Sequence, residues 1–238
     1  MKRFICPLTV FAGAFLATLL LQRYTFIMQE YDGLFLVSSD YFSSMMRTPF
    51  PASGVIGDFL TQFFRFSIYA PLIVGAGVAA AFLMVRGIGK KFSLAGDLLP
   101  AAASCALWLV IAFAPTARRG VAAVLALFLI WAASRLLPDR NARKPMPLWV
   151  NIASCAVLTA GVFLFIALSG TLRGREQTAA VRVAAVSSDW DRVLALATPA
   201  KAASSPELMP YAFLALGEKG LLGDELFKYP VRSRGDLD

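Results

Sequence analysis

Long apolar runs dominate the first two thirds of the chain. They contain no acidic residue and no basic residue except Arg135, and they occupy residues 4–21, 66–85, 98–113, 121–137 and 148–168. A bilayer core about 30 Å thick needs about 20 apolar residues in a helix, so each run predicts a transmembrane helix, of which the third and fourth are short. The pattern predicts an all-α fold: a polytopic membrane helix bundle of about five transmembrane helices in residues 1–168, followed by a small soluble α-helical tail.

The region 22–65, between the first two runs, is too long for a simple connector. Its segment 48–54 holds two prolines and a glycine, which predicts a turn that interrupts any helix. From residue 55 to 65 apolar residues recur at helical spacing, opposite Asp58 and Arg65. This pattern predicts an amphipathic helix in the outer interface, with its phenylalanines among acyl chains and Asp58 and Arg65 in water. The alternative is that its polar face lines a groove.

The tail, residues 169–238, has the apolar spacing of soluble helices. The predicted elements are helices at 178–197, at 207–218 and from 222 to 229, with a loop at 199–206. Ser187-Ser188-Asp189 can restart the first helix with a cap, and Gly220 fits the left-handed position after the second helix. Trp190 and the sequence around Gly217 are typical of a tetratricopeptide-like helical pair, and a plain helical hairpin is the alternative.

Charge sets the expected orientation. The formal net charge of +8 comes from the membrane half, and basic residues cluster in two short loops, at residues 86–91 and 135–144. The positive-inside rule therefore places these loops and the N-terminus in the cytoplasm, and the tail in the periplasm, for a multi-pass protein of the cell inner membrane. We interpret residues 4–21 as a retained anchor, because this run is longer than a signal core and lacks a small-x-small end, with cleavage after an alanine as the alternative.

Composition excludes several kinds of site. The chain has no histidine, which excludes a histidine base, a mixed histidine–cysteine zinc site and haem ligation through histidine. Its three cysteines each fall inside an apolar run, where we expect small apolar residues rather than ligands. We therefore expect no metal and no cofactor. The bilayer is the expected partner, together with a protein bound through the tail, and the basic loops are interpreted as topogenic rather than as a nucleic-acid patch.

Four segments carry a resemblance to a known family. They are Gln29–Leu36, Ser39–Phe42, Gly57–Phe64 and Leu214–Pro230. Together they resemble an uncharacterised family of multi-pass membrane proteins of Bacteroidota with a helical-repeat, tetratricopeptide-like C-terminal region. Members of that family carry several repeats and this chain stops after the first, so the resemblance implies a truncated member. It implies an architecture and an inner-membrane location, and no reaction.

Two functions fit these observations. The first is a non-enzymatic envelope anchor that presents a helical protein-interaction surface. The alternative is a membrane glycosyltransferase that uses a lipid-linked sugar, with a carboxylate of the first outer loop as base and arginines beside the leaving phosphate. The candidate residues are Asp32 or Asp40 for the carboxylate and Arg47, Arg65, Arg118 or Arg119 for the phosphate. Their simpler interpretation is as solvated loop charges, and for that reason we favour the anchor.

Overall fold

The computed structural model describes residues 4–33, 35–92, 96–114, 116–137 and 146–230. Five of the predicted cytoplasmic charges lie outside these residues: Lys2, Arg3, Arg140, Arg143 and Lys144. Every regular element in the described ranges is a helix. The chain divides into two compact units, which we call the membrane unit, residues 1–169, and the tail unit, residues 170–238.

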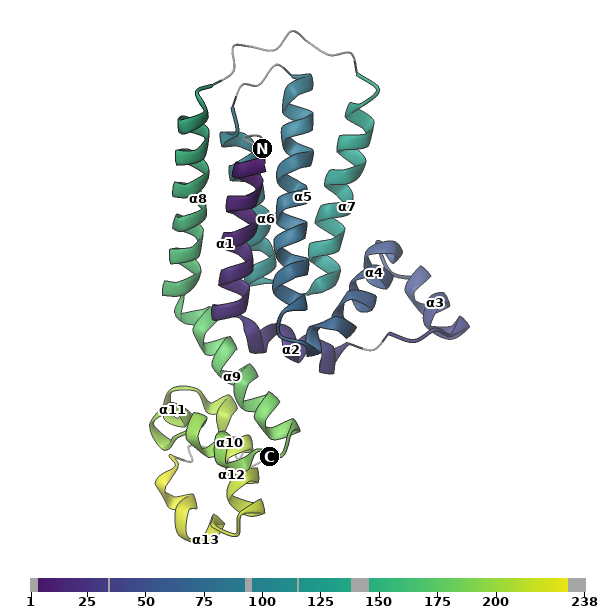
Figure 1. The fold of residues 1–238 in the computed structure, drawn as a ribbon. Helices are drawn as coiled ribbons and strands as arrows, with labels where there is room; N and C mark the ends of the chain where they lie inside the picture. The colour runs from purple at the N-terminus through teal and green to yellow at the C-terminus, as the bar shows by residue number, and fades with distance from the viewer. Residues whose placement is uncertain (1–3, 34, 93–95, 115, 138–145, 231–238) are drawn as a thin grey trace. The chain divides into compact units, whose positions relative to one another are not determined.

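Five long apolar helices form the bundle of the membrane unit. They are α1 (Ile5–Leu21), α5 (Tyr69–Lys91), α6 (Leu98–Phe113), α7 (Ala117–Ser134) and α8 (Leu148–Leu168). Helix α1 packs against α5 and α8, and α5 also packs against α6 and α7, so α5 lies at the centre of the bundle (Figure 1). The bounds of α6 and α8 are those that hydropathy predicts.

The bundle supports three of the predicted spans, or up to four. Helices α5, α7 and α8 are long and apolar enough to cross a membrane. Helix α1 meets the same test only together with α2 (Arg23–Asp32), which follows it after a bend of 77°. Helix α6 is a shorter apolar helix. The protein is therefore an all-α, multi-pass candidate membrane protein.

Two helices of the bundle differ from the predicted bounds. Helix α5 begins at Tyr69 and continues through Lys91, beyond the apolar run. Helix α7 begins at Ala117, so Arg118 and Arg119 lie in its first turn rather than in a loop. Arginine is a good helix former, and hydropathy alone therefore sets the start of this helix too late.

The region between α1 and α5 is mostly helical. After α2 it contains α3 (Ser39–Met46), α4 (Pro51–Thr61) and the 3-10 helix η2 (Gln62–Arg65). The prediction of a turn through residue 54 is wrong, because α4 begins at Pro51. Phe50 takes a left-handed conformation, with φ of 78°, and Pro51 occupies the first turn, where a missing amide costs little.

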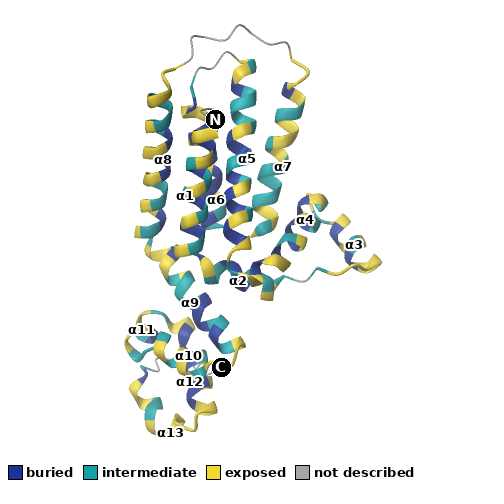
Figure 2. Ribbon diagram, viewed as in Figure 1, coloured by how far each residue is buried: buried dark blue, intermediate teal, exposed yellow. Residues whose placement is uncertain are grey.

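Small residues let the helices of the bundle approach closely. A Cβ atom on Gly13 of α1 would lie 2.1 Å from Thr159 Cγ2 of α8. Many leucines and phenylalanines are exposed, and the exposed positions follow the outer faces of the helices (Figure 2). This arrangement is typical of helix packing in lipid. Cys6, Cys105 and Cys155 are buried thiols among these contacts.

Polar contacts join helices at one end of the bundle, where α5 and α7 have their C-termini. Arg86 Nε lies 2.9 Å from Asp97 Oδ1, just before α6, and the Asp97 amide donates to Asn151 Oδ1 of α8 at 3.1 Å. Lys91 Nζ donates to the Leu137 carbonyl at 3.0 Å, after α7. Four of the five bundle helices are therefore joined at this end.

The tail unit is a set of short helices around a core of its own. They are α9 (Gly170–Val186), α10 (Trp190–Leu196), α11 (Pro199–Ser204), η3 (Pro206–Leu208), α12 (Met209–Glu218), α13 (Leu222–Glu225) and η4 (Leu226–Lys228). Helices α9, α10 and α12 contact one another. The core residues are Val181, Ala184, Val193, Ala197, Ala202, Leu208, Met209, Ala212, Ala215, Leu216 and Tyr229.

Most local signals in the tail are confirmed. The Asp189 side chain accepts from the Arg192 amide and restarts the chain as α10. Gly220 has a φ of 68°, the left-handed conformation expected after α12. The prediction of a loop at 199–206 is wrong, because α11 forms there with Pro199 in its first turn. The predicted start of the first helix at residue 178 is also wrong, because α9 begins at Gly170.

Candidate functional site

The candidate site begins where α4 crosses the first turn of α7. A Cβ atom on Gly57 would lie 2.8 Å from both the Cα and the amide nitrogen of Arg118, so only glycine permits this approach. On the same helix, a Cβ atom on Gly54 would lie 3.2 Å from Met45 Sδ of α3. The two glycines bring α4 against α3 and α7 and place Asp58 between them.

Asp58 binds two other helices through its carboxylate. Arg118 Nε donates to Oδ1 and Arg118 Nη2 donates to Oδ2, both at 2.7 Å. Tyr41 Oη of α3 donates to Oδ2 at 2.8 Å. The carboxylate is 5% exposed, whereas the Arg118 side chain is 49% exposed. The prediction that Asp58 lies in water is wrong, because the face of α4 that carries it packs against α3 and α7.

This contact holds Tyr41 in its neutral form. Burial, and after it the hydrogen bond to the Asp58 carboxylate and the charge of that carboxylate, together raise the pKa of Tyr41 from its ordinary value of 10 to about 12. A negative phenolate would face the Asp58 charge directly, which is unfavourable in a buried position. Tyr41 therefore acts here as a hydrogen-bond donor, and the arrangement of three side chains neutralises one buried carboxylate.

Aromatic rings extend the contact beside Asp58. Phe35 lies edge to face against Tyr41 and against Phe59, with ring centroids 5.5 and 5.6 Å apart. Phe59 continues to Phe63 at 5.4 Å and Phe63 to Tyr69 at 6.2 Å, at the start of α5. Such edge-to-face pairs add to the energy of burial. The rings give this end of the membrane unit the aromatic character typical of a membrane interface.

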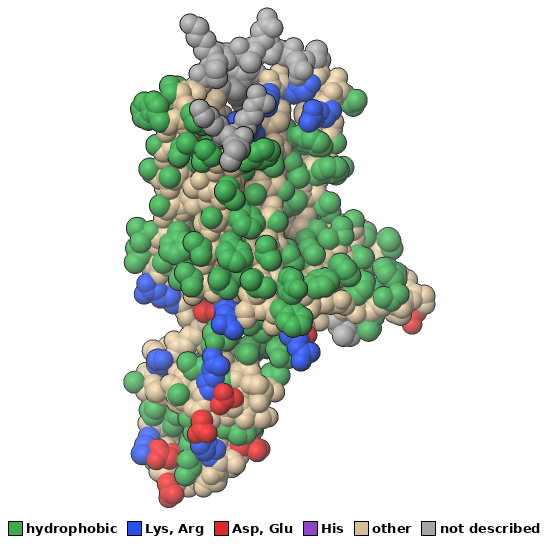
Figure 3. Space-filling model, in the orientation of Figure 1, with side chains coloured by type: hydrophobic (Ala, Val, Ile, Leu, Met, Phe, Trp, Pro, Cys, Tyr) green, Lys and Arg blue, Asp and Glu red, His purple; other side chains and the backbone are tan. Residues whose placement is uncertain are grey.

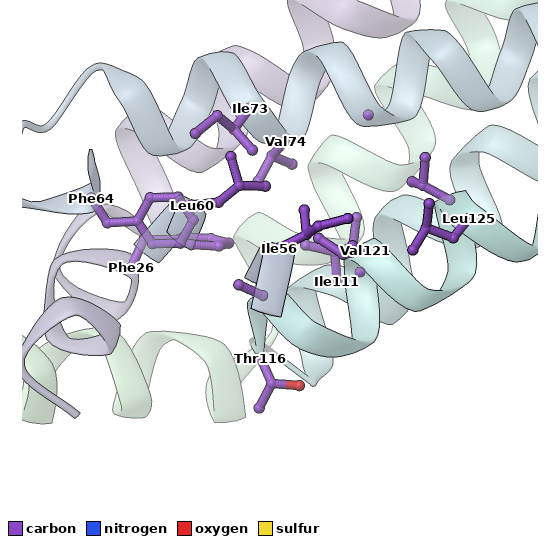
Figure 4. A pocket seen from close by; sticks show the side chains of 14 residues that line it. Phe26, Ile56, Leu60, Phe64, Ile73, Val74, Ile111, Thr116, Val121 and Leu125 are labelled. Atoms are coloured by element: carbon purple, nitrogen blue, oxygen red, sulfur yellow. The ribbon is translucent and has the colours of Figure 1, made fainter. Parts of the chain in front are cut away.

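An apolar cavity of about 250 Å³ lies beside the ion pair, within the membrane unit (Figure 4). Its walls come from α2, α4, η2, α5, the end of α6 and the first half of α7. The lining residues are Phe26, Ile56, Leu60, Phe64, Ile73, Val74, Gly77, Ile111, Thr116, Ala117, Gly120, Val121, Val124 and Leu125. Thr116 alone among them has a polar side chain.

The predicted candidates are dispersed around this end of the membrane unit. Asp32 ends α2, Asp40 lies in the first turn of α3, and both are exposed. Arg47 follows α3, Arg65 ends η2 and Arg119 follows Arg118, and these three side chains are exposed as well. None of the six candidates lines the cavity. The contact that the fold does form joins Arg118 to Asp58, a carboxylate that sequence reasoning assigned to the solvent.

The described part of the chain shows no grouping of three histidine, cysteine or acidic side chains that could hold a metal ion. Hydrophobic side chains cover the bundle in the view of Figure 3, and Lys and Arg side chains lie at both of its ends. The site therefore consists of a buried ion pair, an aromatic cluster and an apolar cavity.

Comparison with models of protein families shows the family to which this chain belongs. Its residues 1–175 match the model of a family of unknown function, DUF6057, and the chain belongs to that family. The match covers the whole membrane unit, including the Asp58–Arg118 pair and the cavity. Comparisons with curated proteins and with solved structures gave no match.

Proposed function

We propose that this DUF6057 protein is a non-enzymatic envelope anchor, whose membrane unit attaches a helical tail unit that binds another protein. One observation carries the proposal: the tail unit closes its own core and still exposes large apolar side chains. Phe227 of η4 is 88% exposed, and Leu214 of α12 and Leu222 of α13 are exposed as well. Exposed apolar residues on consecutive helices are typical of a protein interface, where an aromatic side chain often contributes most.

The helical pair of the tail suits this role. Helices α10 and α12 pack against each other and against α9, as the helices of a tetratricopeptide-like unit do. Tyr229 Oη donates to the Ala197 carbonyl at 3.0 Å, which fixes the end of η4 to the end of α10. Burial raises the pKa of Tyr229, so its hydroxyl stays a donor. The exposed apolar residues therefore lie on a closed framework.

Photo-crosslinking in cells tests the binding surface. A photoreactive benzoylphenylalanine in place of Phe227 should yield an adduct of one discrete mass with a partner protein. The same residue in place of Lys201, which is exposed on α11, is the matched control and should yield none. Absence of an adduct at Phe227, or an identical adduct at both positions, contradicts the proposal.

We propose further that the protein lies in the inner membrane of a Bacteroidota cell with five spans, a cytoplasmic N-terminus and a periplasmic tail. The five helices of the bundle alternate in direction, and Arg86, Lys90 and Lys91 of α5 share one end with the C-terminus of α7, as the Lys91–Leu137 bond shows. Basic clusters of this kind favour the cytoplasmic side. Alkaline phosphatase fused after Ser169 should be active and fused after Lys91 inactive, and the reverse pattern contradicts this orientation.

A glycosyltransferase that uses Asp32 or Asp40 is the second candidate. Its chemistry needs an outer-loop carboxylate near an arginine, and the fold supplies that combination at Asp58 and Arg118. The Asp58 oxygens already accept three hydrogen bonds, which suits a structural role better than that of a base. Asp32 and Asp40 are both exposed, as solvated loop charges are, so Asn at both positions should leave complementation of a deletion strain intact, whereas loss of complementation at normal abundance supports the enzyme.

A further inference from the structure

The cavity lies beside the contact between α5 and α7, where small residues leave space between the two helices. On α7 the lining residues recur along one face, from Thr116 to Leu125, a length of about 13 Å at 1.5 Å per residue. On α5 they are Ile73, Val74 and Gly77, which also share a face. A Cβ atom on Gly77 would meet only Val124 Cγ2, at the ordinary contact distance of 3.8 Å. The missing side chain of Gly77 therefore leaves an elongated space between α5 and α7.

This space reaches the surface of the membrane unit. Ile56, on its α4 wall, is exposed, and Val121, Val124 and Leu125 are half-buried. Beyond Leu125 the surface of α7 continues with exposed Phe128, and the adjoining Leu129 and Ile130 are exposed too. Because α7 is a candidate membrane span, this continuous apolar surface lies in the hydrocarbon of the bilayer. Lipid chains are therefore the apolar molecules present at the opening.

The polarity of the walls changes along the cavity. Thr116 lies at the end where α7 begins, and the walls toward Leu125 are entirely apolar. A phospholipid has the same order of groups: a charged phosphate at the interface and a hydrocarbon chain below it. The Thr116 hydroxyl can donate to the phosphate, and the wall toward Leu125 matches the chain.

We propose that the cavity between α4, α5 and α7 holds one acyl chain of a bilayer phospholipid, whose phosphate lies at the Thr116 end. The lipid fills a space that the side chains leave open and joins the interfacial helix α4 to the two spans. This binding site is independent of the protein-binding role proposed for the tail. It makes the packing of α4 sensitive to the lipid composition of the membrane.

Photoactivatable lipid tests the proposal on the full chain. The protein is reconstituted in phosphatidylethanolamine–phosphatidylglycerol vesicles that contain phosphatidylglycerol with a diazirine in its acyl chain, and adducts are located by mass spectrometry. Phe64 and Val74 line the cavity and are buried, so surface lipid does not reach them. We expect adducts on these two residues, in addition to the adducts that any surrounding lipid forms on exposed Val157 and Leu164 of α8.

A matched pair of glycine variants identifies the occupant. Gly77→Leu places a side chain in the cavity between α5 and α7, and it should reduce the adducts on Phe64 and Val74 while leaving those on Val157 unchanged. Gly161→Leu adds the same side chain on α8, where a Cβ atom meets nothing within 4 Å, and should change neither set. If Gly77→Leu does not insert into the membrane, Val121→Phe fills the same space.

Two results overturn the proposal. One is labelling of Val157 and Leu164 with none on Phe64 and Val74 in the natural sequence, which is also the result if a helix of a second copy occupies the cavity. The other is labelling of Phe64 and Val74 that persists undiminished in a stably inserted filled variant. Loss of labelling only in the filled variant supports the lipid site.

Discussion

One leucine from each unit shows how the two units differ. Leu164 of α8 in the membrane unit is 57% exposed, whereas Leu208 of η3 in the tail unit is 0% exposed. In water, apolar side chains gain free energy by leaving the solvent, and the tail core follows that rule. In a bilayer the solvent is itself apolar, so large side chains can face outward and the interior is left to residues that pack closely.

Glycines show the same difference. In the membrane unit, Gly13 and Gly57 occupy positions where a Cβ atom would collide with a neighbouring helix. Cβ atoms on tail glycines meet nothing within 4 Å, as at Gly174 and Gly217. The membrane unit therefore depends on close backbone approach for its packing, and the tail unit depends on buried apolar volume.

Replacing one leucine of each unit by alanine should give the largest difference in the free energy of unfolding. Leu208→Ala removes a fully buried side chain and should lower the free energy of unfolding of the tail unit by about 2–5 kcal/mol. Leu164→Ala removes a lipid-facing side chain and should change stability by less than about 0.5 kcal/mol. Urea-dependent proteolysis of the full chain in micelles, with the cut sites assigned to each unit, measures both. Similar losses for the two variants would mean that Leu164 contributes to stability as a buried core residue does.

The two partners of the Asp58–Arg118 ion pair should differ in their effect on stability, because Asp58 is buried and Arg118 is half exposed. Arg118→Ala leaves the Asp58 charge buried without its cation and should cost about 3 kcal/mol, the lower part of the range for such a loss. Asp58→Asn leaves Arg118 half exposed, where water can hydrate it, and should cost less. Thermal melts in micelles, with hydrogen exchange of α4, measure the difference.

The neighbouring arginine supplies the control for this asymmetry. Arg119→Ala removes the same side chain one residue later, from an exposed position, and should change stability by less than about 0.5 kcal/mol. Equal losses for Arg118→Ala and Arg119→Ala would mean that the effect comes from the first turn of α7 and not from the contact with Asp58.

Hydropathy predicted the helices of the bundle well, because a helix that crosses a bilayer needs about 20 apolar residues. The bounds of α6 and α8 coincide with those of uncharged apolar runs, which Asp97 and Ser169 each bound on one side. The prediction was less accurate where the chain leaves the hydrocarbon, as at α5 and α7, whose charged turns remain helical. A run of apolar residues indicates where a helix is buried in lipid, and its hydrogen-bonded ends extend beyond that run.

The contact between Asp58 and Arg118 was not predictable from local pattern, since 60 residues separate the two partners. The polar face of the segment 55–65 was interpreted as solvated, which is the commoner outcome for such a face. A signal was nevertheless present in Gly54 and Gly57, which lie three apart on the same helix. Small residues at this spacing indicate a packed face, and Asp58 directly follows them.

The smallest expected effect concerns Tyr41 and its dependence on pH. Tyr41→Phe removes one hydrogen bond to a carboxylate that keeps its two bonds to Arg118, and should cost about 1.5 kcal/mol at neutral pH. Tyr31→Phe, on the exposed surface of α2, is the control and should cost less than about 0.5 kcal/mol.

The sign of the pH effect follows from the raised pKa of Tyr41. Its pKa of about 12 in the folded protein exceeds the ordinary value of 10, so folding favours the protonated phenol. The stability that Tyr41 contributes is therefore fully present below pH 10 and decreases as the pH rises toward about 12. Melts of the natural sequence and of Tyr41→Phe should differ by a constant amount up to about pH 9.5 and converge above it. A difference that stays constant to about pH 11.5, or that grows, would show that the Tyr41 hydroxyl is not held against the buried Asp58 carboxylate.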